Sequence, residues 1–123
     1  MRIWKRTIKT DDMEREVEFV NQYRNTRHGF AHDTTMFIDG REIESATCHY
    51  LNRTWECYTY QSVMLKAVRQ RINYIEVCNE RKLKECNGWK KLTPARRDEL
   101  KKFNEETIEW QFYHKLYDAL NER

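Results

Sequence analysis

The spacing of hydrophobic and polar residues changes near Trp55. Before it, hydrophobic residues alternate with polar ones as in strands, and from about Tyr60 they recur every three or four positions as in amphipathic helices. The pattern predicts an α+β fold with a sheet part at about residues 1–57 and a helical part at about residues 58–121. Because 123 residues make one ordinary domain, we expect residues 1–123 to form a single domain.

Asp39-Gly40 stands between two alternating runs and predicts a two-residue hairpin turn, because both central positions of that turn need a positive φ. With this loop, Met36 faces Ile43, His32 faces Thr47 and Phe30 faces His49. The face that we expect to be buried contains Phe30, Met36, Ile38, Ile43 and Leu51.

Residues 15–23 fit two structures. Val17, Phe19 and Tyr23 alternate as in a strand, whereas Met13, Val17 and Val20 would form the stripe of a helix that begins near Asp11. We favour the strand, because a lone hairpin is only marginally stable. The prediction is therefore a three-stranded antiparallel β-meander, and Trp4 and Ile8 are compatible with a further short edge strand.

The second part predicts a long antiparallel helical hairpin. The first helix covers 60–86 and ends before Asn87-Gly88, since glycine is common just after a helix. The second covers 94–121 and begins with Thr93 as N-cap and Pro94 in the first helical position. Such helices are longer than the strands, so we expect one end of the hairpin to project.

Charge is distributed unevenly along the chain. The 23 Lys and Arg against 20 Asp and Glu give a net charge of only +3, but residues 80–102 carry nine basic and four acidic residues. This segment is the tip of the hairpin and includes Trp89. Cations around an aromatic ring suit nucleic-acid binding, because cations contact phosphates and a ring stacks on an exposed base. The candidate binding residues are Lys82, Lys84, Trp89, Lys90, Lys91, Arg96, Arg97 and Lys101. The alternative is a solvated helix end whose Trp89 covers the hairpin core.

The predicted register places His28, His32 and His49 on one face of the sheet. Three imidazoles can hold zinc with one open position, which would suit a metal-dependent enzyme. The alternative is a set of partly buried histidines that bond to backbone or hydroxyl groups. No nucleophile elbow, phosphate loop, dinucleotide fingerprint or zinc-protease motif occurs in the sequence. We therefore expect a protein without catalytic activity and without a cofactor.

The N-terminal residues do not form a secretion signal, and no stretch of about 18 apolar residues suggests a membrane span. We expect a cytoplasmic protein that does not bind membranes. Its four cysteines, Cys48, Cys57, Cys78 and Cys86, are then expected to be reduced thiols.

Aromatic and aliphatic residues cover more than one face of the last helix, from Ile108 to Leu120. One face would pack on the first helix and the sheet, and the other would remain for a partner, such as a second copy in a homodimer. The alternative is burial of both faces within one compact domain.

Residues 25–68 resemble small proteins carried by phages and other mobile elements of Gram-positive bacteria. The motifs that carry the resemblance are Gly29-Phe30-Ala31-His32-Asp33, the Asp39-Gly40 turn, Asn52-Arg53-Thr54-Trp55-Glu56 and Tyr60-Gln61-Ser62-Val63-Met64. The resemblance implies an accessory protein that binds and sterically inhibits a bacterial defence nuclease, as anti-CRISPR proteins do. The implied partner is a host protein or nucleoprotein complex such as a CRISPR effector nuclease, in the cytoplasm of the bacterial host.

Overall fold

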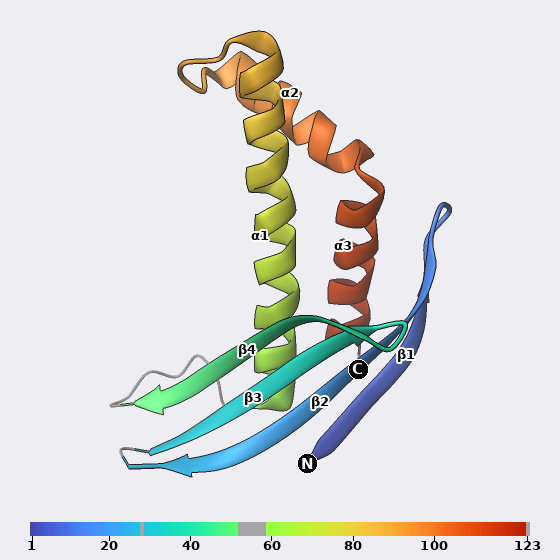
Figure 1. The fold of residues 1–123 in the computed structure, drawn as a ribbon, viewed down its shortest axis with the longest axis vertical. Helices are drawn as coiled ribbons and strands as arrows, with labels where there is room; N and C mark the ends of the chain where they lie inside the picture. The colour runs from blue at the N-terminus through green and yellow to red at the C-terminus, as the bar shows by residue number, and fades with distance from the viewer. Residues whose placement is uncertain (28, 52–58, 123) are drawn as a thin grey trace.

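The structure is a computed structural model that describes residues 1–27, 29–51 and 59–122. Its elements are β1 (Arg2–Lys9), β2 (Glu14–Thr26), β3 (Gly29–Ile38), β4 (Arg41–Leu51), α1 (Tyr60–Asn87), α2 (Pro94–Glu106) and α3 (Ile108–Asn121). The four strands form one antiparallel sheet in the order β1-β2-β3-β4, and the helices stand on one side of it (Figure 1). Within the described ranges, no helix is both long enough and apolar enough to cross a membrane.

The predicted three-stranded sheet with a helical hairpin is wrong in two respects, although the α+β class holds. The short run around Trp4 and Ile8 is a full fourth strand, β1, because its inward side chains complete the core: Ile8 is buried, and the Trp4 ring lies 5.6 Å from that of Phe19. The predicted helix over 94–121 is two helices, α2 and α3, which meet at Thr107.

The strand interpretation of residues 15–23 is confirmed. These residues lie within β2, which pairs with β1 on one side and with β3 on the other. Val17, Phe19 and Asn21 are buried at every second position, as a strand with one face on the core requires.

The predicted hairpin register holds only next to the turn. Asp39 and Gly40 have φ values of 51° and 81°, and Ile38 pairs with Arg41 as expected. A β-bulge between Met36 and Phe37 then shifts the pairing, so that Met36 faces Glu44 and no longer Ile43. An extra residue in one strand moves every later side chain of that strand to the other face.

The shift changes which residues of β4 are buried. Met36 is buried as predicted, and Ile38 and Ile43 pack partly against the core, but Phe30 is only partly buried. In the predicted register Ala46 and Cys48 would lie on the face opposite Ile43, but both belong to the core. The side chain of Leu51 lies outside the described part.

The core lies between the sheet and the helices α1 and α3. Strand residues such as Val17 and Phe19 pack there with Val63, Val68 and Leu116. Both parts of the chain thus contribute to this core, and the single-domain organisation stays a prediction.

The ends of α1 and the start of α2 follow the sequence signals. The α1 helix ends at Gly88, whose φ of 64° lies in the left-handed region that favours glycine. The N-cap of α2 is Thr93, whose side chain accepts a hydrogen bond from the Arg96 backbone N–H, and Pro94 follows it as predicted.

A buried polar network lies where α2 ends and α3 begins. The amide of Asn79 in α1 donates to Asn104 Oδ1 at 2.8 Å and to Thr107 Oγ1 at 3.0 Å. The Thr107 hydroxyl in turn donates to the carbonyl of Phe103. Thr107 itself has an extended backbone conformation, with φ −78° and ψ 121°. The network therefore supports a break in a segment whose sequence otherwise continues as a helix.

Cysteine chemistry differs from the prediction at one position. Cys48 is disulfide-bonded in the structure, whereas Cys78 and Cys86 are free. Cys57 lies outside the described residues. The expectation of reduced thiols is therefore wrong for Cys48.

Candidate functional site: a projecting basic arm

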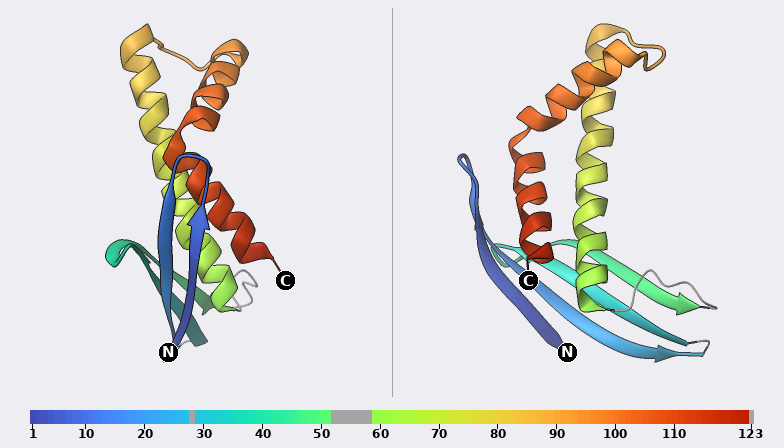
Figure 2. Two further views of the ribbon diagram at one scale, coloured as in Figure 1. Left: turned by 90° about the vertical axis from the view of Figure 1, so that its right-hand side faces the viewer. Right: turned by 180° about the vertical axis from the view of Figure 1, so that it is seen from behind.

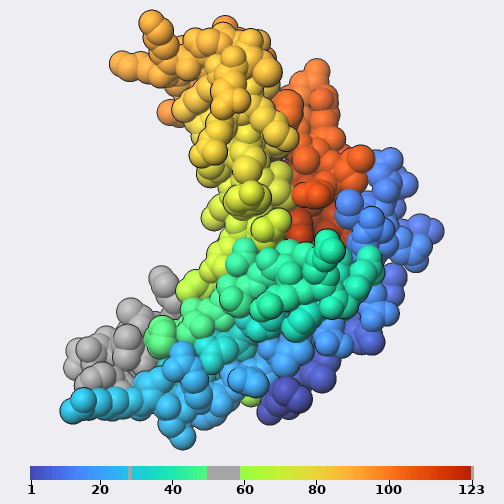
Figure 3. Space-filling view, in the orientation of Figure 1, coloured from blue at the N-terminus to red at the C-terminus, as the bar shows by residue number. Residues whose placement is uncertain are grey.

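The basic segment predicted from the sequence forms the end of the molecule that is farthest from the sheet. We call residues 80–102 the arm; they include the last turns of α1, the connection to α2 and the first turns of α2. Figure 1 shows this part above the sheet, and Figure 3 shows that it stands clear of the sheet on the visible face. Because α1 has 28 residues, it is about 42 Å long and carries its end well beyond the sheet.

Two of the predicted cations of the arm are occupied by contacts within the molecule. Lys84 forms an ion pair with Glu80 at 3.1 Å. Arg96 forms one with Glu99 at 3.1 Å and lies over the ring of Trp89 at 5.2 Å. Both side chains are partly buried, so they contribute to the structure of the arm as well as to its charge.

The other predicted cations are exposed. Lys82, Lys90, Lys91, Arg97 and Lys101 have no ion pair among those of the described residues, and all five are exposed. Exposed Arg81 and Lys102 lie in the same segment. The structure therefore brings most of the predicted site residues to one end of the molecule, with their charges available to an anionic partner.

Trp89 does not have the predicted binding role in this conformation. Its side chain is buried, with only 8% of its surface exposed, and Arg96 covers its ring. A ring in this position cannot stack on a nucleic-acid base. The alternative interpretation, in which Trp89 covers the core of the hairpin, agrees with the structure.

Two exposed hydrophobic residues on α1 lie close to the arm, and the sequence analysis did not predict them as site residues. Tyr74 and Val77 are 57% and 53% exposed, and Arg71 lies over the Tyr74 ring at 4.9 Å. The signal was present, because both residues fall outside the buried stripe that contains Val68, Ile72 and Ile75. Val77 also lines a shallow hollow of about 380 Å³ with Arg81 and Lys84 of the arm.

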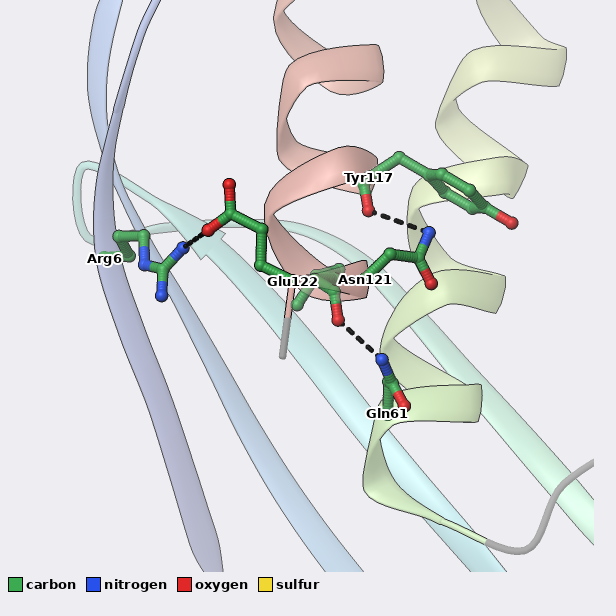
Figure 4. Close-up of polar contacts among 6 residues, drawn as sticks. Arg6, Gln61, Tyr117, Asn121 and Glu122 are labelled. Carbon is green, nitrogen blue, oxygen red and sulfur yellow. Dashed lines mark hydrogen bonds and ion pairs between the residues drawn. The ribbon is translucent and has the colours of Figure 1, made fainter.

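Polar contacts join the C-terminal end of α3 to the rest of the molecule (Figure 4). Arg6 of β1 forms an ion pair with Glu122 at 2.9 Å, and the Gln61 amide of α1 donates to the Leu120 carbonyl at 2.6 Å. The Asn121 amide donates to the Tyr117 carbonyl. The first two contacts join β1 and the first turn of α1 to the C-terminal end of α3, at the end of the molecule opposite the arm.

The structure does not form the predicted histidine cluster. The bulge pairs His49 with Ala31 and His32 with Cys48, so His32 and His49 lie on opposite faces of the sheet. His32 is buried among rings, 5.1 Å from Tyr60 and 5.4 Å from Tyr23, whereas His49 is exposed. His28 lies outside the described residues, and no group of three potential metal ligands occurs within them. The metal-dependent alternative therefore loses its geometric basis.

The last helix uses its aromatic residues mainly inside the molecule. Phe112, Tyr113, Leu116 and Leu120 are buried, and the partly buried Trp110 donates its indole N–H to Glu76 at 3.0 Å. Ile108 is the large hydrophobic residue of α3 that remains exposed. This agrees with the alternative of burial within one compact unit. The homodimer stays a prediction, without a large apolar surface on α3 to support it.

Comparison of the chain with protein-family models, with curated proteins and with solved structures finds no match.

Proposed function

We propose that this protein is a non-catalytic inhibitor from a phage or mobile element that binds a bacterial defence nuclease in the host cytoplasm. The expected target class is a nucleoprotein effector of the CRISPR type. The arm would bind this effector and inhibit it by steric hindrance. The observation that carries the proposal is the group of exposed cations on the arm, far from the sheet and its core, which form no ion pair with any residue that the structure describes.

The surface next to these cations supports contact with a protein that carries nucleic acid. Tyrosine and arginine are enriched in the residues that dominate protein–protein binding energy. Tyr74, covered by Arg71, and Val77 present such a surface on α1 beside the arm. A nucleoprotein offers phosphates to the cations and protein surface to these side chains.

Reversal of three arm charges tests the proposal. The variant Lys90→Glu, Lys91→Glu, Arg97→Glu should no longer co-purify with the effector and should no longer inhibit its DNA cleavage. Arg96 is left unchanged, because it stacks on Trp89 and its loss would alter the arm itself. The measurements are co-purification with guide-loaded effectors of several types and a cleavage assay with each.

The matched control makes the same change in net charge away from the arm. Arg27, Arg41 and Arg69 are exposed, and Arg27→Glu, Arg41→Glu, Arg69→Glu should leave binding and inhibition unchanged. Undiminished cleavage by every effector at saturating wild-type protein would reject the proposal. Equal loss in both variants would reject the arm as the binding surface.

The same cations support a second candidate function, direct binding of nucleic acid without a protein partner. In that case fluorescence anisotropy should show binding to an oligonucleotide whose logarithmic affinity falls linearly with the logarithm of salt concentration. The triple arm variant should weaken the binding and flatten that slope by up to about 0.7–0.9 for each lost phosphate contact. An unchanged slope would exclude the arm as the nucleic-acid site.

A further inference from the structure

A cavity of about 500 Å³ lies at the base of the molecule, between the sheet and the first turn of α1. Arg2, Ile3 and Trp4 of β1 line one part of it, and Thr59, Tyr60, Gln61 and Met64 line another. Asn21 of β2 and His32 of β3 complete the lining. This volume is in the range of ordinary small-molecule sites. The cavity is separate from the arm, which lies at the opposite end of α1 (Figure 2).

The charges around the cavity favour an anion. Among the described residues that line it, Arg2 is the only one with a charged side chain. The N-terminus of α1 also borders the cavity, and the helix dipole places partial positive charge at the N-terminus. The Thr59 side chain caps the N–H of Ser62, and the Val63 N–H bonds to the Thr59 carbonyl. Among the hydrogen bonds of the described residues, the N–H groups of Tyr60 and Gln61 have no acceptor, so they are available to an anionic group.

Two buried polar side chains in the lining indicate that a polar partner belongs in the cavity. Asn21 is 1% exposed and His32 is 7% exposed. Within the described part of the chain, neither Asn21 Oδ1 nor His32 Nδ1 has a hydrogen-bond partner, and the Asn21 amide nitrogen reaches only the sulfur of Met64 at 3.5 Å. Buried polar atoms are almost always paired, because an unpaired one is destabilising.

The remaining lining combines the apolar residues Ile3 and Met64 with two aromatic rings. Trp4 comes from β1 and Tyr60 from α1, so aromatic surface borders the cavity from two different elements. Arg6 lies over the Trp4 ring at 5.4 Å, so a planar group can stack there only on a ring face that Arg6 leaves open. The cavity thus combines an anion site, aromatic walls and an unpaired amide.

We propose that this cavity binds a nucleotide. The phosphate would lie at the N-terminus of α1 near Arg2, and the base would lie against Trp4 and Tyr60. Asn21 and His32 would bond to the base edge, since an asparagine amide pairs with the donor and acceptor atoms of a base. A nucleotide offers a binding partner to all three parts of the lining: the anion site, the aromatic side chains and the unpaired amide. Inorganic phosphate offers a partner to the anion site alone. The ligand is either a free nucleotide or the phosphorylated end of a strand, which have the same chemistry.

The test is an NMR titration of the full chain with each of the four ribonucleoside 5′-monophosphates, with the matching nucleosides and with inorganic phosphate. At least one monophosphate should shift the amides of Tyr60 and Gln61 and the indole N–H of Trp4 in a saturable way. Its nucleoside should bind about tenfold or more weakly, because charge-assisted hydrogen bonds to the phosphate are lost. Phosphate alone should leave the Trp4 signal unshifted.

Two variants separate the parts of the site. Arg2→Gln should weaken the nucleotide and leave the nucleoside unchanged, whereas Tyr60→Leu should weaken both. Arg41→Gln, which removes an exposed arginine outside both the cavity and the arm, is the matched control and should bind the nucleotide like the wild type. Far-ultraviolet circular dichroism before each titration confirms that the variant is folded.

The source of the nucleotide is decided with an oligonucleotide that carries the same base at its 5′ end, with and without a 5′-phosphate. Tighter binding of the phosphorylated oligonucleotide than of the monophosphate identifies a strand end, and the reverse identifies a free nucleotide. The proposal is overturned if neither a monophosphate nor the phosphorylated oligonucleotide gives saturable shifts, or if nucleoside and nucleotide bind equally. It is also overturned if Arg41→Gln weakens binding as much as Arg2→Gln, which would show that Arg2 makes no specific contact with the phosphate. Because the nucleotide assay involves no nuclease, its failure and the failure of the proposed inhibition are independent results.

Discussion

Single side chains on the outer face of the sheet form a compact charged group. Arg24 Nε donates to Asp33 Oδ2 at 2.7 Å, and the Thr47 hydroxyl donates to Asp33 Oδ1 at 2.6 Å. The hydrogen bond from Arg24 is the main reason why the pKa of Asp33 lies below its usual value, and partial burial opposes this shift. The folded protein therefore favours the deprotonated carboxylate more than the unfolded chain does.

This linkage predicts the pH dependence of the contribution of Asp33 to stability. Because its folded pKa is lowered, the stabilisation is fully present above the unfolded pKa of about 3.9 and is lost as pH falls through the folded pKa. Asp33→Asn should lower the free energy of unfolding by about 1 kcal/mol or less at pH 7, since the ion pair is partly exposed. Urea unfolding of both proteins at pH 7 and near pH 2 measures the difference, which should shrink at acid pH.

Asp12→Asn is the control, because Asp12 is exposed and has no hydrogen bond or ion pair among those of the described residues. It should leave stability unchanged at both pH values. If Asp33→Asn lowers the free energy of unfolding equally at pH 7 and near pH 2, the charge of Asp33 is not the cause of its stabilising effect.

At the scale of elements, the break between α2 and α3 distinguishes the real fold from a simple helical hairpin. A break at Thr107 lets α3 pack on α1 and the sheet while α2 continues into the arm (Figure 1). Asn79 stabilises the break from the facing helix, since its amide bonds to both Asn104 and Thr107.

We predict that Asn79→Ala destabilises the protein by about 1–3 kcal/mol, because it leaves the buried Asn104 oxygen unpaired. Asn73→Ala is the matched control: Asn73 lies on the same helix, is exposed and should change stability by no more than about 0.5 kcal/mol. Denaturant unfolding of both variants measures the difference. Similar small effects in the two variants would show that the network does not support the break.

At the scale of the whole molecule, burial is concentrated in the part of α1 nearest the sheet. Val63, Met64, Ala67, Val68, Ile72 and Ile75 are buried there, whereas Asn79 and Trp89 are the buried residues farther along the hairpin before α2. Regions with few buried apolar contacts open with lower free energy than the core.

Rates of native-state hydrogen exchange should therefore differ between the arm and the part of the helices that packs on the sheet. Amides of residues 81–86 and 96–102 should exchange much faster than those of residues 64–72 and 112–116, whose protection should approach that of global unfolding. The measurement is exchange followed by NMR or mass spectrometry under native conditions. Uniform protection along α1 would show that the arm and the base open as one unit.

Local sequence signals predicted those elements that depend on neighbouring residues. The positive φ values of Asp39 and Gly40, the end of α1 at Gly88 and the start of α2 at Thr93-Pro94 follow from turn and cap chemistry within a few residues. The alternation in β2 and the period of α1 are equally local. The sequence also indicated the basic arm, because the cations of residues 80–102 are adjacent in the chain.

The features that the sequence left undecided depend on residues that are distant in the chain. The break at Thr107 is supported by Asn79, 28 positions earlier, and the burial of Trp89 depends on how Arg96 folds over it. The bulge beside Met36 moved His49 away from His32, and the cavity beside α1 requires Arg2, Asn21, His32 and Tyr60 from four separate elements. Periodicity specifies which face of an element is apolar, but packing between elements decides which side chains meet.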